Sequence, residues 1–224
     1  MSMQDFNQFA DDWLDPDGSQ KALHRIHPLR MEFILKHIPK APASIWDAGC
    51  AAGLIANDLA AINYDVYACD AAKELVKAAR GRAKELGLNT QFKTQPIEKH
   101  RPSTPYQAII CSEVIEHVEE PNEILEHFDQ CTEKDSVLVI STINRTFEAF
   151  IKAIVGAEYI LNIIPKGTHR YEKLVTPSEI ISPLQKMGWQ LLDLTGIDYN
   201  PWTEKASLCR SVNINYILAM KKIK

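Results

Sequence analysis

Short apolar runs alternate with longer amphipathic segments through the centre of the chain. The apolar runs have the length of buried strands and span 44–50, 64–70, 90–95, 107–112 and 136–143. Between them, apolar positions recur at helical spacing over 54–61, 72–86 and 121–131. Strands that alternate with helices need crossover connections, so the pattern predicts an α/β fold with a mostly parallel sheet and helices on both faces.

The pattern changes after residue 143. Residues 146–164 are strongly apolar with helical spacing, and a basic loop follows over 165–173. Thr176 and Glu179 have the spacing of a capping box, which predicts another helix that ends at Gly188. The last apolar runs, around 189–195 and 213–220, predict two strands that complete the sheet edge as a hairpin.

We therefore predict a single domain over residues 1–224, made of four consecutive parts. These are an N-terminal helical segment (1–43), the core of a cofactor site (44–143), an apolar and basic insertion (144–175), and a C-terminal helix with sheet-completing strands (176–224).

Composition narrows the function classes. Of the 224 residues, 46% are hydrophobic and 24% are charged, which is typical of a soluble globular chain. The formal net charge of −4 argues against broad nucleic-acid binding, so no nucleic-acid partner is expected. The N-terminus lacks a signal-peptide apolar core, and no run reaches the ~20 apolar residues of a membrane span. We expect a cytoplasmic protein, or one that is peripheral at the inner face of the membrane.

The cysteines and several histidines receive structural interpretations. Cys50, Cys69 and Cys111 stand at the ends of apolar runs, where a small buried residue is expected, and no Cys-x-x-Cys spacing occurs. A second group stands among charged residues typical of a surface and is assigned no role: His37, His100 and His127.

The strongest motif joins the first predicted strand to a helix through the loop Asp47-Ala48-Gly49-Cys50-Ala51-Ala52-Gly53. Glycine at a strand end permits a tight turn, and small side chains let a ligand approach the main chain. Asp70 closes the next strand, where a carboxylate accepts hydrogen bonds from ribose hydroxyls. Neither a G-x-G-x-x-G pattern nor a P-loop lysine is present, so the loop favours S-adenosylmethionine (SAM) over a dinucleotide. An ordinary tight turn is the remaining alternative.

A second motif, Ser112 to Val118, follows the fourth predicted strand. If this stretch turns helically, Glu113, Glu116 and His117 converge as an oxygen and nitrogen site suited to Mg²⁺, Mn²⁺ or Zn²⁺. Such a metal would lower the pKa of a catechol-like hydroxyl. Alternatively His117 acts directly as a general base, because its unperturbed pKa is near neutrality. A polar loop without chemistry is the third interpretation.

These motifs, together with segments outside the sheet, resemble the ubiquinone-biosynthesis O-methyltransferase family over nearly the whole chain. The residues that carry the resemblance are Trp13-Leu14-Asp15, Leu23 to Arg30, Asp47 to Cys50, Glu113 to Val118, Ser141 to Thr146, Val155 to Leu161 and Pro165 to His169. The resemblance implies a class I SAM-dependent methyltransferase with a Rossmann-like, mostly parallel seven-stranded sheet. It also implies methylation of hydroxyls on a polyprenylated phenol or catechol, at two steps of ubiquinone synthesis.

The resemblance also assigns roles to residues. It implies SAM contacts at Arg30, Gly49, Asp70 and Ser112, and a divalent metal such as Mg²⁺ or Zn²⁺ at the Glu113, Glu116 and His117 triplet. A guanidinium suits the SAM carboxylate, which favours that contact for Arg30. The chain departs from the family where Ala51 and Ala52 replace usual glycines, His27 a usual asparagine and Leu14 a usual tryptophan. These departures concern cofactor affinity and substrate contacts rather than the reaction class.

The insertion suggests a membrane contact. Over 146–162 the polar residues occupy one narrow face, and the wide apolar face is followed by cationic Lys166, His169, Arg170 and Lys173. An apolar helix beside cations lies well in a membrane interface, which would suit a polyprenyl tail. Packing of the same helix against the domain is the alternative.

Two other functions compete with the methylation of a phenol. Small-RNA 2′-O-methyltransferases share a Glu-x-x-Glu-His metal motif, although the acidic composition here disfavours RNA. A non-catalytic SAM-binding scaffold among other ubiquinone-biosynthesis proteins is the second alternative. The length of the polyprenyl chain, the metal's identity, the number of methylation steps and the oligomeric state stay open.

Overall fold

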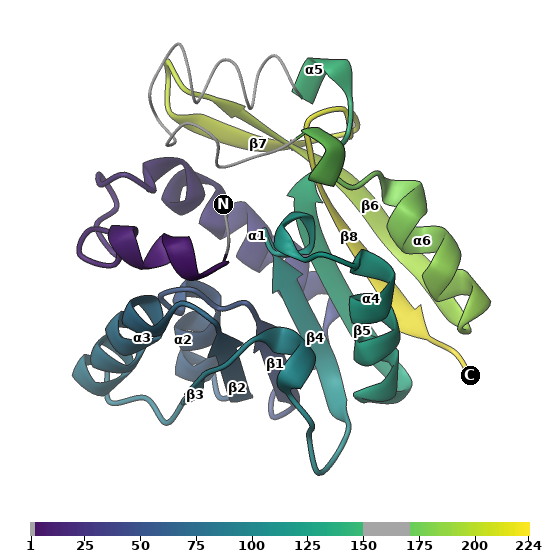
Figure 1. Ribbon diagram of the computed structural model, residues 1–224, viewed down its shortest axis with the longest axis horizontal. Helices are drawn as coiled ribbons and strands as arrows, with labels where there is room; N and C mark the ends of the chain where they lie inside the picture. The colour runs from purple at the N-terminus through teal and green to yellow at the C-terminus, as the bar shows by residue number, and fades with distance from the viewer. Residues whose placement is uncertain (1–2, 150–170) are drawn as a thin grey trace.

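A single mixed sheet organises the protein (Figure 1). The computed structural model describes residues 3–149 and 171–224, and this part of the chain contains an eight-stranded sheet of order β3-β2-β1-β4-β5-β8-β6-β7. The strands are β1 (Ser44–Ala48), β2 (Asp65–Asp70), β3 (Gln91–Thr94), β4 (Tyr106–Ser112), β5 (Thr132–Ile143), β6 (Trp189–Asn200), β7 (Lys205–Cys209) and β8 (Asn215–Lys222).

The first five strands run parallel, as the alternating pattern predicts. Within β1, Asp47 lies opposite Ala68 of β2 and Ile110 of β4, both in parallel register. The last three strands pair antiparallel, with β8 between β5 and β6. The expectation of an α/β fold with a mostly parallel sheet is therefore confirmed.

The sheet has one strand more than the seven expected, whereas the two predicted late strands form as β6 and β8 and pair antiparallel with each other. Strand β7 is an additional strand, and it forms the edge by pairing with β6 from Gly196↔Cys209 to Asn200↔Lys205. Strand β8 follows β7 in the chain but inserts between β5 and β6. The sequence of β7, KASLC, is short and only partly apolar, so its hydrophobic pattern carries little signal for a strand.

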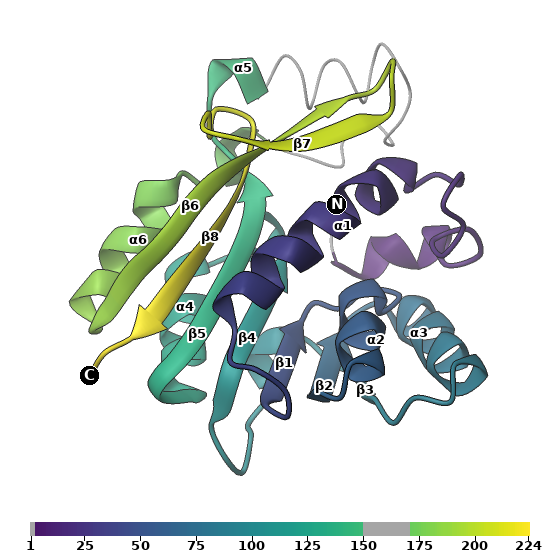
Figure 2. The same ribbon diagram turned by 180° about the vertical axis from the view of Figure 1, so that it is seen from behind.

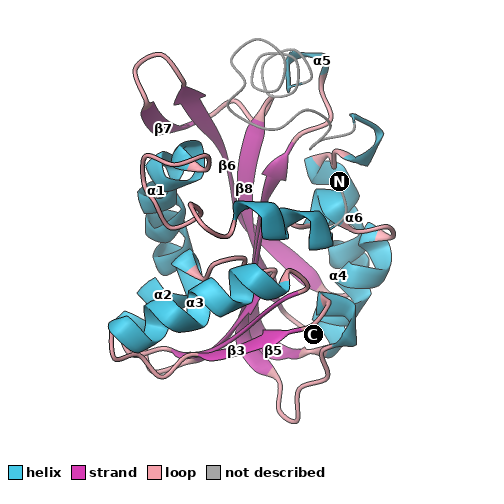
Figure 3. Cartoon of the chain, turned by 60° about the vertical axis from the view of Figure 1, so that its left-hand side comes forward, coloured by secondary structure: helices cyan, strands magenta, loops and turns pink. Residues whose placement is uncertain are grey.

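Helices cover both faces of the sheet (Figure 3). They are α1 (Lys21–His37), α2 (Leu54–Ala61), α3 (Lys73–Glu85), α4 (Pro121–Gln130) and α6 (Pro177–Lys186). Helices α1, α2 and α3 lie on one side, where α1 crosses the sheet in Figure 2, and α4 and α6 lie on the other. Successive strand residues point to opposite faces, so Ile45 packs in the core under α1 and α2 while Trp46 packs under α4.

Local sequence signals fix the helix boundaries. Helix α2 begins after Gly53, whose left-handed φ of 77° turns the chain out of the loop. At α6 the Thr176 hydroxyl and the Glu179 side chain form the predicted capping box, with Pro177 in the first turn. These signals place the helices within one or two residues of the predicted ends.

The N-terminal segment packs over the glycine loop. A 3₁₀ segment, η1 (Met3–Phe9), precedes Trp13, which forms a buried cluster with Ala52, Ala72 and Leu75. This segment therefore covers the loop that the sequence marks as the cofactor site.

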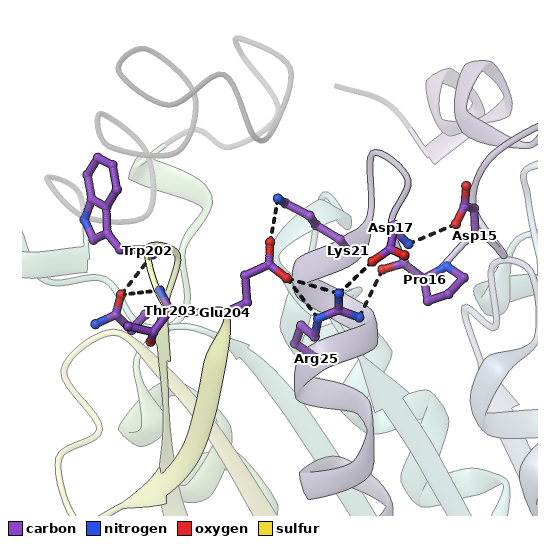
Figure 4. Close-up of polar contacts among 9 residues, drawn as sticks. Asp15, Pro16, Asp17, Lys21, Arg25, Trp202, Thr203 and Glu204 are labelled. Atoms are coloured by element: carbon purple, nitrogen blue, oxygen red, sulfur yellow. Dashed lines mark hydrogen bonds and ion pairs between the residues drawn. The ribbon is translucent and has the colours of Figure 1, made fainter.

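Ion pairs connect α1 to the chain on both sides of it (Figure 4). Glu204, at the β6–β7 turn, accepts from Lys21 at 2.9 Å and from Arg25 at 3.1 Å. Arg25 also pairs with Asp17 at 2.7 Å. Helix α1 is thus tied to the β6–β7 hairpin at one side and to the N-terminal turn at the other.

The insertion is described only at its ends, by α5 (Phe147–Ala149) and η5 (Tyr171–Lys173). Most of the predicted helix over 146–164 and most of the basic loop lie outside the described residues, so the membrane contact there stays a prediction. Among the helices that the structure describes, none has the length and hydropathy needed to cross a bilayer.

The structure confirms the expectation for the cysteines but not the one for two of the histidines. Cys50, Cys69 and Cys111 are buried free thiols, as expected. His100 and His127 are also buried, each with 7% of its surface exposed, so their assignment to the surface is wrong. The charged residues beside them in the sequence point outward while the imidazoles pack against Trp46.

Candidate active site

The site lies where parallel strands β1, β2, β4 and β5 end at the same edge of the sheet. The carboxyl ends of such strands are where α/β folds bind their ligands. Gly49 follows β1, Asp70 ends β2, and Ser112 ends β4 beside Ser141 of β5. The structure thus brings three of the four predicted cofactor residues to one edge, and Arg30 reaches the same edge from α1 through its contact with Glu113.

The glycine loop is held tightly against its neighbours. Gly49 has a φ of +83° and donates its N–H to the Cys69 carbonyl at 2.8 Å. A Cβ at this position would lie 2.3 Å from Cγ2 of Val114, so only glycine fits. The loop therefore lies directly against the Glu113 to His117 turn.

Asp70 connects the end of β2 to the loop. Its Oδ2 accepts the N–H of Ala51 at 2.9 Å and its Oδ1 accepts the N–H of Ala72 at 2.7 Å. Burial raises the pKa of Asp70, and these backbone amides oppose that rise. One carboxylate thus ties the glycine loop to the turn that precedes α3.

Asp47 is a second buried carboxyl at this edge. It is 2% exposed, and burial, followed by the charge of Asp70, raises its pKa to about 7. Its Oδ2 has no hydrogen-bond partner among the residues described. A ligand or water that donates to Asp47 would satisfy this oxygen.

The two alanines of the loop have different environments. Ala51 has a φ of 45°, which is uncommon for a residue with a Cβ. Ala52 is fully buried in the cluster with Trp13. Ala52 therefore packs against the N-terminal segment with η1 and Trp13 that covers the loop, which we call the N-terminal cover. Ala51, in contrast, adopts a backbone conformation that glycine would adopt more easily.

Arg30 and Glu113 form a nearly buried ion pair. Nη2 of Arg30 lies 2.5 Å from Oε1 of Glu113, and the two side chains are 8% and 22% exposed. Ser141 donates to the same carboxylate at 3.4 Å and shares a 2.8 Å hydrogen bond with Ser112. These contacts link two predicted SAM contacts, Arg30 and Ser112, to the first glutamate of the predicted metal site.

Glu113 also has an unusual backbone. Its φ of 56° is positive, and such outliers in residues with a side chain occur preferentially at functional sites. Its N–H donates to the Ser141 carbonyl at 2.9 Å, which extends the ladder between β4 and β5 by one residue. The left-handed residue then turns the chain away from the sheet into the 3₁₀ turn η3 (Ile115–His117).

Glu116 has a buried carboxyl group that lacks partners. Both side-chain oxygens lie without a hydrogen bond among the described residues. Burial, and secondarily the charge of Glu113, raises the pKa of Glu116.

His117 lies at the end of the same turn, beneath the N-terminal segment. Its ring contacts the Phe6 ring edge-on, with centroids 5.2 Å apart. Within residues 3–149 and 171–224, no three His, Cys, Asp or Glu side chains are arranged to hold a metal ion. The donor types of the triplet suit a divalent cation, and the unpartnered oxygens of Glu116 would accept one, but Glu113 is bound to Arg30 here.

Four residues at this site received no role of their own from the sequence: Asp47, Ser141, Phe6 and Trp13. Asp47 interrupts an otherwise apolar strand, and that interruption was an available signal. Ser141 was not identified because its role depends on the parallel register of β5 against β4. The position of Phe6 and Trp13 over the site has no local signal, because it arises from packing between distant segments.

Curated relatives match the chain along most of its length. The methyltransferase-domain family matches residues 19–207. A ubiquinone biosynthesis O-methyltransferase of Xylella fastidiosa (strain 9a5c) is 39% identical over 215 residues, covering 95% of this chain and 87% of that protein. A protein of the same name from Xanthomonas euvesicatoria pv. vesicatoria is 37% identical over 214 residues, with 95% and 90% covered.

Solved structures agree on the fold. The magnesium protoporphyrin IX methyltransferase ChlM from Synechocystis PCC 6803, solved with bound SAH, superposes with a TM-score of 0.72 at 20% identity, covering 98% and 97% of the two chains. A SAM-dependent methyltransferase from Aquifex aeolicus gives 0.63 at 16% identity, with 97% and 98% covered. At these identities the likeness establishes a class I methyltransferase fold and nothing about the methyl acceptor.

Proposed function

The chain belongs to the ubiquinone biosynthesis O-methyltransferase family, and from this premise we propose that it transfers the methyl group of SAM to phenolic hydroxyls of polyprenylated ubiquinone precursors. The main support is the identity of 39% over 95% of the chain to a relative of that name. The site agrees with this proposal, because the glycine loop, Asp70 and the Glu113 to His117 turn meet at one edge of the sheet. RNA methylation and a scaffold role are not favoured.

The cofactor half of the proposal rests on four residues. We propose that Asp70 holds the ribose hydroxyls, that Gly49 lets the cofactor approach the main chain, and that Arg30 and Ser112 complete the contacts. Arg30 is 6% exposed and its Nε has no hydrogen-bond partner in the described part of the chain. A buried guanidinium N–H without a partner is suited to a carboxylate such as that of SAM.

The acceptor half rests on the Glu113 to His117 turn. SAM supplies an electrophilic methyl group, and the protein's part is to hold the phenolic oxygen opposite to it and to remove its proton. We propose that His117 takes this proton as a general base, or alternatively that a divalent cation such as Mg²⁺ or Zn²⁺, which Glu113, Glu116 and His117 would hold, makes the hydroxyl easier to deprotonate. The cation would lower the pKa of the hydroxyl, and Glu113 would have to leave Arg30 to bind it.

The polyprenyl tail needs an apolar environment outside this site. We propose that the insertion, together with apolar residues that are exposed elsewhere on the described surface, meets the membrane in which such a substrate dissolves. Phe147 at the start of the insertion is 73% exposed and Trp202 at the β6–β7 turn is 79% exposed. A cytoplasmic enzyme that is peripheral to the inner face of the membrane, near other ubiquinone-biosynthesis proteins, follows from this proposal.

One experiment tests the reaction. The purified protein is incubated with SAM and a polyprenyl catechol of short chain length, with and without EDTA, and S-adenosylhomocysteine (SAH) is measured. We expect turnover on the catechol and none on its doubly methylated analogue. Turnover on small RNA without turnover on the catechol would overturn the proposal.

The EDTA arm separates the two ways of removing the proton. Loss of activity in EDTA that Mg²⁺ or Zn²⁺ restores would support the cation. Full activity in EDTA, after metal removal is verified, would leave His117 as the base. A His117→Ala variant should lose most activity in either case, because it removes either a general base, which typically contributes about 10²- to 10⁴-fold, or a ligand of the cation.

A further inference from the structure

The nearly buried pair of Arg30 and Glu113 occupies both a cofactor residue and an acceptor residue of the proposed site. We infer that SAM binding separates this pair: Arg30 exchanges the Glu113 carboxylate for the carboxylate of SAM, and Glu113 is released toward the methyl acceptor. This inference rests on the proposed function, because it takes Arg30 as the residue that binds the SAM carboxylate. It adds that cofactor binding prepares the acceptor half of the site.

The geometry of Arg30 supports the exchange. Glu113 contacts only Nη2, and the neighbouring Nε lies buried without a partner. Nε–H and one Nη2–H point from the same edge of the planar guanidinium, and this edge binds a carboxylate through two parallel hydrogen bonds. The contact in the structure uses half of that edge, so a carboxylate that binds both groups would displace Glu113.

The surroundings of Glu113 provide a destination after the exchange. Its carboxylate already accepts from Ser141, and it is 22% exposed, so it stays partly solvated when Arg30 leaves. Its charge also acts on Glu116, whose oxygens lack partners. The released carboxylate would therefore lie in the half of the site where the acceptor, or a cation, is proposed to bind.

Two ligands distinguish the exchange from general effects. SAH carries the carboxylate, whereas 5′-methylthioadenosine shares the adenosine and the sulfur but has no carboxylate. In the wild-type protein, part of the SAH binding energy is used to separate Arg30 from Glu113. Removal of the competing charge should therefore tighten the binding of SAH and leave the binding of 5′-methylthioadenosine unchanged.

The variant Glu113→Gln makes this test by titration calorimetry in EDTA. We expect its affinity for SAH to rise about fivefold, which is typical of a coupled site, with no change for 5′-methylthioadenosine. Arg30→Gln should weaken SAH binding alone. Glu119→Gln, an exposed neighbour with the same change in charge, should bind both ligands as the wild type does.

Weaker or equal SAH binding by Glu113→Gln would overturn the exchange, since the glutamate would then hold Arg30 in place or contact SAM itself. Because the variant leaves a buried arginine without a charged partner, it is expected to unfold more easily. Thermal unfolding then provides a second measurement: SAH should raise the melting temperature of Glu113→Gln more than that of the wild type, whereas 5′-methylthioadenosine should raise both equally. Equal shifts with SAH would contradict the exchange. Neither measurement uses a methyl acceptor, so the result is independent of the turnover test.

Discussion

The two ends of strand β4 both contain buried titratable groups, but they use them differently. At the amino end, Tyr106 accepts or donates a 2.9 Å hydrogen bond with Nε2 of His100, and Tyr67 stacks on the same imidazole with centroids 4.1 Å apart. Arg101 donates to the carbonyls of Glu98 and His100 at 2.7 and 2.8 Å. None of these side chains has a buried polar atom without a partner among the described residues.

The carboxyl end of the same strand is incompletely paired. Both oxygens of Glu116, Nε of Arg30 and the hydroxyl of Thr142 are buried without hydrogen bonds in the described chain. Such a group costs about 1–3 kcal/mol of stability when neither water nor a ligand bonds to it. The polar groups at the amino end are paired, whereas several at the carboxyl end are not. Titratable residues alone therefore do not identify a site, and buried polar groups that lack partners are the better indicator.

The largest effect is expected at Gly49, where the glycine loop contacts Val114 in the turn after β4. Gly49→Ala would place a Cβ 2.3 Å from Val114 at a φ of +83°. We expect a loss of about 2–4 kcal/mol in unfolding free energy, from overpacking and backbone strain. SAH affinity should fall about a hundredfold, since the loop and the turn can no longer meet.

Urea unfolding and calorimetry measure both effects of Gly49→Ala. Gly81→Ala is the matched control, because a Cβ at this helical glycine meets nothing within 4 Å. That variant should be more stable than the wild type by up to about 1 kcal/mol, with unchanged SAH affinity. An equal loss of SAH binding in both variants would separate the glycine loop from the cofactor.

The second effect concerns the carboxylate that closes the loop. Asp70→Asn leaves one of the amides of Ala51 and Ala72 without an acceptor and weakens the proposed contact with the ribose. We expect SAH affinity to fall about thirtyfold, equivalent to ~2 kcal/mol. Asp65→Asn is the control at the opposite, exposed end of β2 and should leave binding unchanged. Normal SAH binding by Asp70→Asn would remove this residue from the cofactor site.

The paired amino end of β4 predicts a pH dependence of stability rather than of binding. Burial, followed by the charge of His127, lowers the pKa of His100 to about 4, and burial also lowers the pKa of His127. At these two histidines the unfolded chain therefore binds more protons than the folded protein between about pH 6.5 and about pH 4. Their contribution to stability is complete above this window and falls as the pH decreases through it.

Urea unfolding at about pH 7 and about pH 5 tests this dependence. The raised pKa values of Asp47 and Glu116 act in the opposite direction in every variant, so the test is the difference between wild type and His100→Gln. His100→Gln keeps a partner for Tyr106, and its change in stability between the two pH values should be more favourable than that of the wild type by on the order of 1–3 kcal/mol. His24→Gln, a change in α1 away from this cluster, should keep the full acid sensitivity. An acid loss in His100→Gln equal to that of the wild type would assign the sensitivity elsewhere.

The fold was largely predictable because its local signals agree with its global pattern. The five parallel strands and α2, α3, α4 and α6 follow from apolar runs, capping residues and glycine stops. The order of the last three strands was not predictable, because pairing of β8 with β5 depends on contacts between distant segments. The burial of His100 and His127 was missed because neighbouring charges in the sequence do not reveal which way a side chain points.

The site was predictable as a set of residues but not as a set of contacts. Gly49, Asp70 and Ser112 stand at strand ends, so the parallel topology brings them together. The pairing of Arg30 with Glu113 crosses from α1 to the turn after β4, and no periodicity in the sequence encodes it. The sequence therefore predicted Glu113 as a metal ligand but did not reveal that Arg30 pairs with it.

The smallest effects are expected at the two alanines of the glycine loop. Mutation of Ala51 to glycine relieves the strain of its positive φ of 45° in the folded state but raises the entropy of the unfolded chain. These terms oppose each other, so Ala51→Gly should change stability by less than about 0.5 kcal/mol and SAH affinity by less than about twofold. Ala52→Gly should lose about 1 kcal/mol, because its buried methyl group packs with Trp13.

Together the two variants show whether each alanine affects stability through its backbone conformation or through the packing of its methyl group. Urea unfolding of both proteins gives the answer, with calorimetry of SAH as the second readout. If Ala51→Gly loses as much stability as Ala52→Gly, the first methyl group also supports the N-terminal cover. If only Ala52→Gly loses stability, the second alanine is a packing residue and the first is a position where glycine and alanine are nearly equivalent. The N-terminal cover would then depend on Ala52 and Trp13, and the cofactor on the backbone that they cover.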